Sequence, residues 1–483
     1  MKKYDLIIIG SGSAMNIVDP IIQGNPKVKI AVIDKDEPGG ICLTRGCIPS
    51  KIMVYPAELV RTLDDVEALG LKIEVKSVSY EKIMNRMRSL IDKDIESIRE
   101  GLSSSDNIDY YHSKAEFVAP YRIKVGDETL EGEMIFLGTG SRAVIPQVKG
   151  LESAGYQTSD SVIRMEMKRL PASIAIIGGG YIAAEFGHFF AAMGSSVTII
   201  SRNPQLLPAE EPEVSALAAR DMGKHMSIMT NHEVRQVRPK ANGVKTLVAV
   251  DRKTLKTAKV EAEEILVAAG RGPTSDILKP EKGGVRTTKE GWIHVNEFLE
   301  TSQPNVWALG DSHGKYLFRH VANYESEVLY ENAILRRKVE LDYHAIPHAV
   351  FTYPEVASVG LREKEAVKKF GEDGFLIGFH RFEDTAKGEA MNVKDYFVKV
   401  LLERDSRNIL GAHIIGPHAS ILIQEVINLM YTKERGSQPM QDAIHIHPSM
   451  SEVVQWAFGS PMSPEEYHHA LGHYGLATDP PSA

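Results

Sequence analysis

One pattern occurs twice along the chain: a short apolar strand, a glycine-rich turn, a helix and a second strand. The first copy begins with the apolar run 4–9 and ends with the run 28–33, and the second copy extends from 173–177 to 196–200. Each copy has about thirty residues, which is the length of a βαβ unit. The repeat predicts an α/β chain with two parallel, Rossmann-like sheets.

The first glycine turn is typical of a dinucleotide site. Gly10 and Gly12 stand between strand and helix, where free backbone N–H groups and the helix dipole can hold a pyrophosphate. Asp34 follows the second strand, where a ribose hydroxyl needs an acceptor. Met15 occupies the place of a usual third glycine, so we expect the first helix to lie farther from its strand than is common. A tight turn without any ligand is the alternative for such a motif taken alone.

The second glycine turn favours a phosphorylated nucleotide. Gly178 and Gly180 repeat the spacing, but Ser201 and Arg202 stand where an acid would bind the ribose. An acid would repel a 2′-phosphate, whereas a hydroxyl and a guanidinium can hold one through charge-assisted hydrogen bonds. The sequence therefore favours NADP over NAD, and the alternative is that Arg202 is a solvated surface residue.

Both cysteines of the chain lie in the segment from Gly39 to Lys51. Cys42 and Cys47, separated by four residues on one expected helical turn, can close a disulfide, and a nearby helix N-terminus lowers the pKa of a thiol. Two cysteines in 483 residues exclude a disulfide-stapled secreted scaffold, and a metal site would require further ligands. A redox pair is therefore favoured over a structural disulfide or a metal site.

A histidine segment near the C-terminus is a candidate for proton transfer. His447 follows His445 and precedes Glu452. An imidazole suits proton transfer to a thiol near neutral pH, and a carboxylate can fix its tautomer. Taken alone, His447 is more often a structural histidine. Two alternating histidines could also suggest a metal, but no cysteine or carboxylate cluster accompanies them, so we predict no metal.

Charge and hydropathy exclude several classes of function. The 56 basic and 64 acidic side chains give a net charge of −8, which does not favour nucleic acid as a partner. The apolar stretch 174–194 has about the length of a membrane span, but three consecutive glycines, Glu185 and His188 favour a strand, a turn and a buried helix. The N-terminal apolar run is too short for a signal peptide. We expect a cytoplasmic protein that binds neither membrane nor nucleic acid.

The rest of the chain shows the signals of further α/β structure. A long helix is expected from a cap at Ser79 to Leu102, and short strands follow as far as a turn that contains Gly140. Gly270 marks the exit from the second unit, and Asp311 places a carboxylate at the end of another strand. The last twenty or so residues, rich in His and Pro, are expected to be loosely structured.

Together, these motifs resemble the pyridine nucleotide–disulfide oxidoreductases, the flavoenzyme family of dihydrolipoamide dehydrogenase, glutathione reductase, mycothione reductase and mercuric reductase. The resemblance covers almost the whole chain and includes Gly310-Asp311, the run 351–360 and the run 445–452. It implies two Rossmann-like dinucleotide-binding domains plus an α+β dimerisation domain. The implied parts are 1–150 and 278–344 for FAD, 151–277 for NAD(P), 345–465 for the interface and 466–483 as a C-terminal extension.

The resemblance also implies where the cofactors bind. FAD would occupy the first turn, with Asp34 at its ribose and Asp311 near its ribitol, and NAD or NADP would occupy the second turn. Lys51 and Glu185 would form the family's pair beside the reactive edge of the flavin. Gly140 and Gly270 complete the expected cofactor contacts.

The implied chemistry is thiol–disulfide exchange linked to a flavin. Cys42 would exchange with a dithiol or disulfide substrate, and Cys47 would lie against the flavin as a charge-transfer thiolate. His447 and Glu452 would form an acid–base dyad that reaches the disulfide from the other subunit of a homodimer. Arg45 replaces a usual apolar residue, and we expect it to lower the pKa of a neighbouring thiol or to contact an anionic substrate group.

The branch of the family is less defined. The run Pro49-Ser50-Lys51 is more similar to dihydrolipoamide dehydrogenase and mercuric reductase, and the lack of a second cysteine pair disfavours the latter. Asn16-Ile17, the run 53–55 and Arg202 are similar to mycothione reductase. Dihydrolipoamide dehydrogenase is favoured, an NADPH-dependent reductase of low-molecular-weight disulfides is the alternative, and a non-catalytic flavin-binding scaffold is a remote one.

Overall fold

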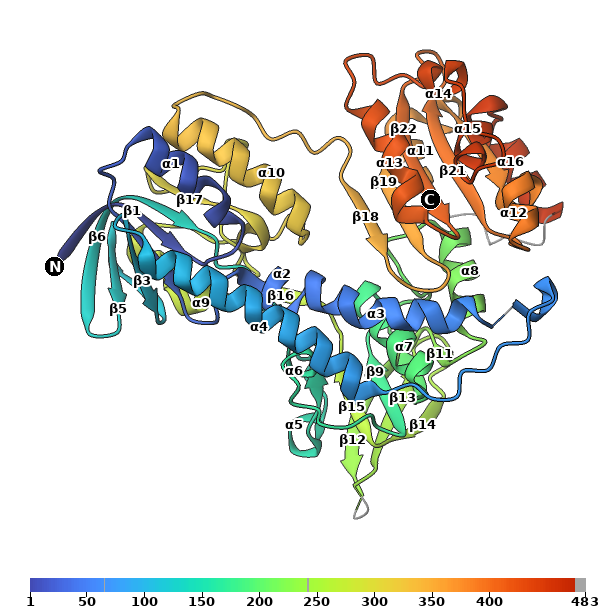
Figure 1. Cartoon of the computed structure of the whole chain (residues 1–483), viewed down its shortest axis with the longest axis horizontal. Helices are drawn as coiled ribbons and strands as arrows, with labels where there is room; N and C mark the ends of the chain where they lie inside the picture. The colour runs from blue at the N-terminus through green and yellow to red at the C-terminus, as the bar shows by residue number, and fades with distance from the viewer. Residues whose placement is uncertain (65, 241–242, 474–483) are drawn as a thin grey trace.

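The computed structural model describes residues 1–64, 66–240 and 243–473. Within them, the chain forms three successive α/β parts, as Figure 1 shows: the first sheet at the left, the second at the bottom and the third at the upper right. The predicted mixed α/β class is confirmed.

The first sheet joins the N-terminus to a strand from the middle of the chain. Its order is β3-β2-β1-β6-β5-β4, with β17 beside β6. The strands are β1 (Lys2–Ile9), β2 (Ile30–Asp34), β3 (Ile108–His112), β4 (Ala115–Ala119), β5 (Arg122–Val125), β6 (Glu128–Leu137) and β17 (Val306–Ala308). β1 is parallel to β2 and β6, and Ile8 stands opposite Val32 and Phe136. Buried parallel strands of this kind read as continuous apolar runs, which explains the sequence signal.

The first glycine turn leads into helix in two steps, not one. A 3₁₀ turn, η1 (Ser13–Ile17), comes first, and α1 (Val18–Gly24) follows it. Met15 lies in η1 and packs against the core between the first sheet and α10 (Arg319–Leu329). The single helix expected directly after Gly12 is therefore divided.

The long helix predicted between the two units is α4 (Tyr80–Ser104), and Ser79 caps it by accepting a hydrogen bond of 3.3 Å from the backbone of Lys82. Its apolar stripe packs with α3 (Cys47–Thr62) and α7 (Tyr181–Met193), where Met87 and Phe189 are fully buried. In Figure 1, α4 runs from the first sheet to the second. The helix therefore links the two units through a shared core.

The second sheet is parallel throughout. Its order is β11-β10-β9-β15-β8, built from β8 (Gln157–Thr158), β9 (Ser173–Ile177), β10 (Ser196–Ile200), β11 (Ser227–Met229) and β15 (Glu264–Val267). An antiparallel sheet of β12 (His232–Pro239), β13 (Lys245–Asp251) and β14 (Thr257–Ala262) is inserted before β15. The ribbon of β7 (Ser141–Ala143) and β16 (Arg271–Pro273) joins this unit to the first.

The third sheet is antiparallel, in the order β18-β19-β22-β21-β20. Its strands are β18 (Pro347–Val350), β19 (Val356–Gly360), β20 (Phe375–Arg381), β21 (Phe397–Glu403) and β22 (Ile409–Ile415). Helices of this part are α11 (Glu363–Phe370), α12 (Ala386–Ala390), α13 (Ala419–Met430), α14 (Gln438–Asp442), α15 (Ser451–Gly459) and α16 (Pro464–His473). The shorter helices elsewhere are α2 (Gly40–Arg45), α5 (Leu151–Ala154), α6 (Ser159–Ile163), α8 (Pro212–Met222) and α9 (Ser275–Leu278).

The expectation of a loose C-terminal segment is wrong for 464–473. These residues form α16, whose Tyr467 and Leu471 are buried against the third sheet. Two apolar side chains four residues apart share one helical face, so a single turn can cover the sheet. Residues 474–483, the rest of that expectation, lie outside the described residues.

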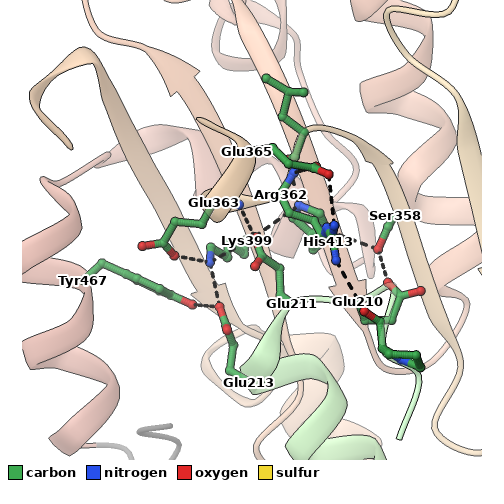
Figure 2. Close-up of polar contacts among 12 residues, drawn as sticks. Glu210, Glu211, Glu213, Ser358, Arg362, Glu363, Glu365, Lys399, His413 and Tyr467 are labelled. Carbon is green, nitrogen blue, oxygen red and sulfur yellow. Dashed lines mark hydrogen bonds and ion pairs between the residues drawn. The ribbon is translucent and has the colours of Figure 1, made fainter. Parts of the chain in front are cut away.

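A buried polar network fixes the third part to the second (Figure 2). Lys399 of β21 is fully buried, and its ammonium lies 2.6 Å from Glu363, 2.7 Å from Glu213 and 3.3 Å from Glu211. Glu211 and Glu213 begin α8, whereas Glu363 begins α11. The hydroxyl of Tyr467 donates to Glu213 at 2.7 Å, so α16 also takes part. Removing Lys399 would leave three buried carboxylates without their common cation.

Candidate active site

The two cysteines lie on consecutive helices, not on one helical turn. Cys42 belongs to α2, Cys47 begins α3, and Gly46 separates the helices. A Cβ atom on Gly46 would lie 2.8 Å from the carbonyl oxygen of Ile41 and 3.1 Å from the Cα of Cys42. Only glycine allows this close approach, which brings the two thiols within hydrogen-bonding reach of each other.

The environment of the pair favours a thiolate near neutral pH. A hydrogen bond from the Cys47 thiol lowers the pKa of Cys42 to about 7, although burial opposes the shift. Arg319 and the backbone N–H groups of Cys47 and Ile48, at the start of α3, act in the same direction. Donating that hydrogen bond raises the pKa of Cys47. The reduced pair thus carries its charge on Cys42, and the charge-transfer role of Cys47 stays a prediction.

Arg45 does not act on the thiols as expected. Its guanidinium lies 2.6 Å from Asp36 and 3.3 Å from Asp160, and its side chain is nearly buried. The arginine that lowers the pKa of Cys42 is Arg319, at the start of α10. Two carboxylates engage the charge of Arg45 and tie α2 to the loop after β2 and to α6. Arg45 also lines the cavity, so its expected contact with an anionic substrate group stays a prediction.

Lys51 and Glu185 form an ion pair beside the cysteines. The ammonium of Lys51, one turn after Cys47 on α3, lies 2.8 and 2.9 Å from the two carboxylate oxygens of Glu185 on α7. The backbone N–H of Phe351, which follows β18, donates to the same carboxylate at 3.1 Å. The ammonium also lies 4.5 Å from the centre of the Phe351 ring. Residues from all three parts of the chain therefore meet here.

A cavity of about 1320 Å³ connects the first glycine turn with the cysteines. Nine predicted site residues line it: Gly10, Gly12, Asp34, Cys42, Cys47, Lys51, Gly140, Glu185 and Asp311. This volume exceeds that of an ordinary small-molecule pocket, about 300–1,000 Å³, and suits an extended dinucleotide.

The lining of the cavity fits FAD. Gly10 has φ +103°, and a Cβ there would lie 2.1 Å from the carbonyl oxygen of Gly138, so any other side chain would close the turn. The hydroxyl of Thr139 is buried and has no hydrogen-bond partner among the described residues. Asp34 accepts from the backbone and the hydroxyl of Ser11 at 2.8 and 2.6 Å. Burial raises the pKa of Asp311, so hydrogen bonds with hydroxyl groups suit this carboxyl group.

The second turn lies outside this cavity, in the second unit. Gly178 has φ +145°, and a Cβ there would lie 2.1 Å from the carbonyl oxygen of Ala268, which repeats the geometry of the first turn. Gly180 caps α7. Gly270, between β15 and β16, has φ +113°. Together the three glycines form the edge of the second sheet at which a nucleotide can bind.

The two residues expected to select NADP differ in exposure. Ser201 is 1% exposed and packs beneath Gly179, and its hydroxyl accepts from the backbone of Asn203 at 3.2 Å. Arg202 is exposed. Arg252, which sequence analysis missed, follows β13 and donates to the carbonyl oxygen of Arg202 at 2.8 Å. The guanidinium of Arg252 therefore lies at the backbone of Arg202, and no local motif could have revealed this contact.

His447 and Glu452 form a pair away from the cavity of their own chain. Nδ1 of His447 lies 2.8 Å from Glu452, which begins α15 and also accepts from the backbone of Ser449 at 3.0 Å. The Ser449 N–H and His447 hold the pKa of Glu452 below its ordinary value. The side chain of His447 is 68% exposed. The ring of His447 is thus largely open to solvent in the single chain, and its role across a subunit interface stays a prediction.

Sequence analysis missed several residues of the cavity. Arg319, Phe318 and His348 line it, and the rings of Phe318 and His348 stack at 5.8 Å. Tyr181 also lines it, and its place directly after Gly180 was an available signal. The described residues contain no group of three His, Cys, Asp or Glu side chains arranged to hold a metal. None of their helices is long and apolar enough to span a membrane.

Comparison with known proteins agrees with the site. The family model of pyridine nucleotide-disulphide oxidoreductases matches residues 4–331, and the model of the family's dimerisation domain matches 346–458. The chain is 33% identical over 467 residues to mycothione reductase of Mycobacterium tuberculosis, covering 94% of this chain and 98% of the relative. It is 34% identical over 476 residues to dihydrolipoyl dehydrogenase of Synechocystis sp., covering 94% and 98%.

A solved structure has the same architecture. The Cu(II) complex of the HOCl-induced flavoprotein disulfide reductase RclA from Escherichia coli superposes with a TM-score of 0.83 at 25% identity, covering 95% of this chain and 99% of that one. Enzymes of the matched family use FAD and NAD(P)H. On these grounds the chain belongs to the pyridine nucleotide-disulphide oxidoreductase family.

Proposed function

We propose that this chain transfers electrons between NAD(P)H and a dithiol or disulfide substrate through Cys42 and Cys47. The observation that carries the proposal is the position of two hydrogen-bonded thiols, next to the Lys51–Glu185 pair, in the cavity that begins at the first glycine turn. A scaffold that only bound flavin would need neither the thiols nor the ion pair. The proposal does not depend on the predicted domain boundaries or on the cytoplasmic location. Both stay predictions.

The chain's own residues hold the cofactors and orient them. The turn at Gly10 and Gly12 and the free hydroxyl of Thr139 are suited to the phosphates and polar groups of FAD, and Asp34 and Asp311 to its hydroxyls. Bound FAD supplies a two-electron carrier between the nicotinamide and the cysteine pair. Lys51, held by Glu185, keeps a positive charge at the cysteine end of the cavity.

Thiol exchange with a disulfide substrate then follows from the reduced pair. The Cys42 thiolate attacks one substrate sulfur, so a mixed disulfide forms and the other substrate sulfur leaves as a thiolate. Cys47 next loses its proton to His447 of the partner subunit and attacks Cys42, which closes the Cys42–Cys47 bond and releases the second substrate sulfur as a thiolate. His447 of the partner subunit, held by Glu452, donates protons to the leaving thiolates. The pair loses two electrons and the substrate gains two, and a dithiol substrate would reverse every step.

Two substrate classes have support. Dihydrolipoamide is favoured by the run Pro49-Ser50-Lys51 and by relatives named dihydrolipoyl dehydrogenase. A low-molecular-weight disulfide reduced by NADPH is favoured by a specific observation: the guanidinium of Arg252 is bound to the carbonyl oxygen of the exposed Arg202, where a 2′-phosphate would bind. Mycothione reductase among the relatives supports the same class.

The test is an assay of the purified flavoprotein with NAD plus dihydrolipoamide, and with NADPH plus a panel of small disulfides. We expect one combination of nucleotide and substrate to support rapid turnover in the unchanged protein. Neither combination should support turnover in Cys42→Ser, which should retain its flavin. Turnover that survives in Cys42→Ser would contradict the proposal. A protein that only passes electrons from NAD(P)H through its flavin, without reaction with any dithiol or disulfide, would contradict it as well. The nucleotide that supports turnover decides between the two substrate classes.

A further inference from the structure

The segment between α3 and α4 exposes an alternating pattern that has no partner within the described chain. From Leu71 to Lys76, apolar and charged residues alternate strictly as Leu-Lys-Ile-Glu-Val-Lys. Such a pattern is typical of a β-strand with one apolar face. The structure nevertheless assigns no strand to 71–79, and Figure 1 shows a stretched coil there.

The apolar side chains of this segment are unusually open to solvent. Leu71, Ile73 and Val75 are 52%, 50% and 44% exposed. Among the described residues, no backbone hydrogen bond joins 72–78 to another segment. Unpaired backbone groups beside an alternating apolar face form a template for strand pairing with another chain. The segment is thus a strand without a sheet.

The charges of the segment identify the chain that fits it. In an antiparallel pair of two copies centred on Ile73, Leu71 stands opposite Val75 and Ile73 opposite itself, which joins the apolar faces. Lys72 then stands opposite Glu74 of the partner subunit, and this attraction occurs twice because of the symmetry. A pair centred on Lys72 or Glu74 places like charges opposite each other. A pair centred between Ile73 and Glu74 places Leu71 opposite Lys76, so apolar side chains of one strand face charged side chains of the other.

The surroundings of the segment agree with a second copy as its partner. The chain carries the dimerisation domain of its family. α3 leads from the exposed Cys47 to the segment, and Ile48, Tyr55 and Leu59 form an exposed apolar stripe along one face of that helix. A two-fold interface uses the same patch on both subunits, so a self-complementary strand that lies on the axis can pair with its own copy.

We propose that residues 71–75 of two subunits pair as an antiparallel β-ribbon on the two-fold axis of the homodimer, in the register centred on Ile73. The ribbon would extend the interface beyond the dimerisation domain and connect the outer ends of both α3 helices. The proposal depends on dimerisation and not on the nucleotide or the substrate.

The test is oxidative cross-linking of the purified holoenzyme carrying Ile73→Cys. Directly opposed residues of an antiparallel pair have Cα atoms about 4.5–5.5 Å apart, within the range of about 4.4–6.8 Å for a disulfide. We expect mild oxidation to give a covalent dimer on a non-reducing denaturing gel. Val75→Cys is the matched control, because residue 75 lies four residues, about 13 Å, from its copy in this register. The unchanged protein, which keeps both native cysteines, is the second control.

A charge exchange tests the register independently. In the Ile73→Cys protein, adding Lys72→Glu places a second carboxylate opposite Glu74 and should lower the rate of cross-linking several-fold. Adding Glu74→Lys as well restores opposite charges and should restore the rate. A monomer in solution, a dimer that does not cross-link at residue 73, or equal cross-linking at residues 73 and 75 would overturn the proposal. Turnover measured on the same samples tests the proposed function separately.

Discussion

Replacing Lys399 by Met should strongly destabilise the junction between the second and third parts of the chain. The ammonium of Lys399 is fully buried within 3.3 Å of three carboxylates, so its loss leaves Glu211, Glu213 and Glu363 facing one another without a cation. Removing one partner of a buried ion pair costs about 3–5 kcal/mol. A loss of 1 kcal/mol lowers the melting temperature of a domain of about 150–250 residues by about 2–4 °C, so we expect the melting temperature to fall by roughly 10 °C.

The matched control is Lys224→Met. Lys224 is 63% exposed and lies 2.8 Å from Asp221, so its loss removes an ion pair of the same type at the surface. Exposed pairs contribute about 0–1 kcal/mol. Thermal unfolding of the holoenzyme, followed by circular dichroism and by tryptophan fluorescence, compares the two variants. A fall no larger in Lys399→Met than in Lys224→Met would refute the reasoning.

The pH dependence of the same variant gives a second check. Burial alone would raise the pKa of Glu363, but the hydrogen bond from His468 and the charge of Lys399 lower it to about 2. Its stabilising contribution is therefore present above the unfolded pKa, about 4.3, and is lost as pH falls towards 2. Without Lys399, this carboxyl group becomes easier to protonate. The difference in melting temperature between the unchanged protein and Lys399→Met should therefore become smaller as the pH is lowered from 7 to 4.5.

The remaining predictions concern the site. Cys47→Ala should raise the pKa of Cys42 from about 7 towards its usual 8.5, because the hydrogen bond from Cys47 is the largest cause of the shift; alkylation rates against pH would show it, and an unchanged profile would contradict it. Arg202→Glu should shift the ratio of kcat/KM for NADPH and NADH at least tenfold towards NADH, and an unaltered ratio would show that this guanidinium does not contact the nucleotide. His447→Ala should slow thiol exchange far more than flavin reduction by the nicotinamide in stopped-flow experiments, whereas equal losses would exclude the proton-transfer role.

The sequence revealed the parts of the fold that depend on local pattern. Continuous apolar runs and glycine spacing located β1, β9 and the turns that follow them, because a buried parallel strand and a phosphate-sized turn each have a local signature. The stripe of α4 with its Ser79 cap was equally clear. The cysteines were identified as a pair, but the helix break at Gly46 was not, since it depends on how closely α2 approaches α3.

Contacts between distant segments could not be predicted. Nothing in the local sequence marks Glu211 and Glu213 as buried, and only the fold brings Lys399 and Tyr467 to them. Arg45 was assigned to a thiol or to an anionic substrate group because it lies between the cysteines in sequence, yet its partners Asp36 and Asp160 come from the loop after β2 and from α6. Helix α16 was missed because the expectation of loose structure rested on the His and Pro content of the whole C-terminal segment, although the spacing of Tyr467 and Leu471 was an available signal.

The most direct test of the account counts thiols during anaerobic reduction. The oxidised holoenzyme is titrated with NADPH or NADH, and its free thiols are alkylated under denaturing conditions and located by mass spectrometry. We predict that the protein takes up two electron equivalents more than the flavin holds. With them, two thiols per chain, Cys42 and Cys47, should become reactive. An unchanged thiol count at full reduction of the flavin would contradict it.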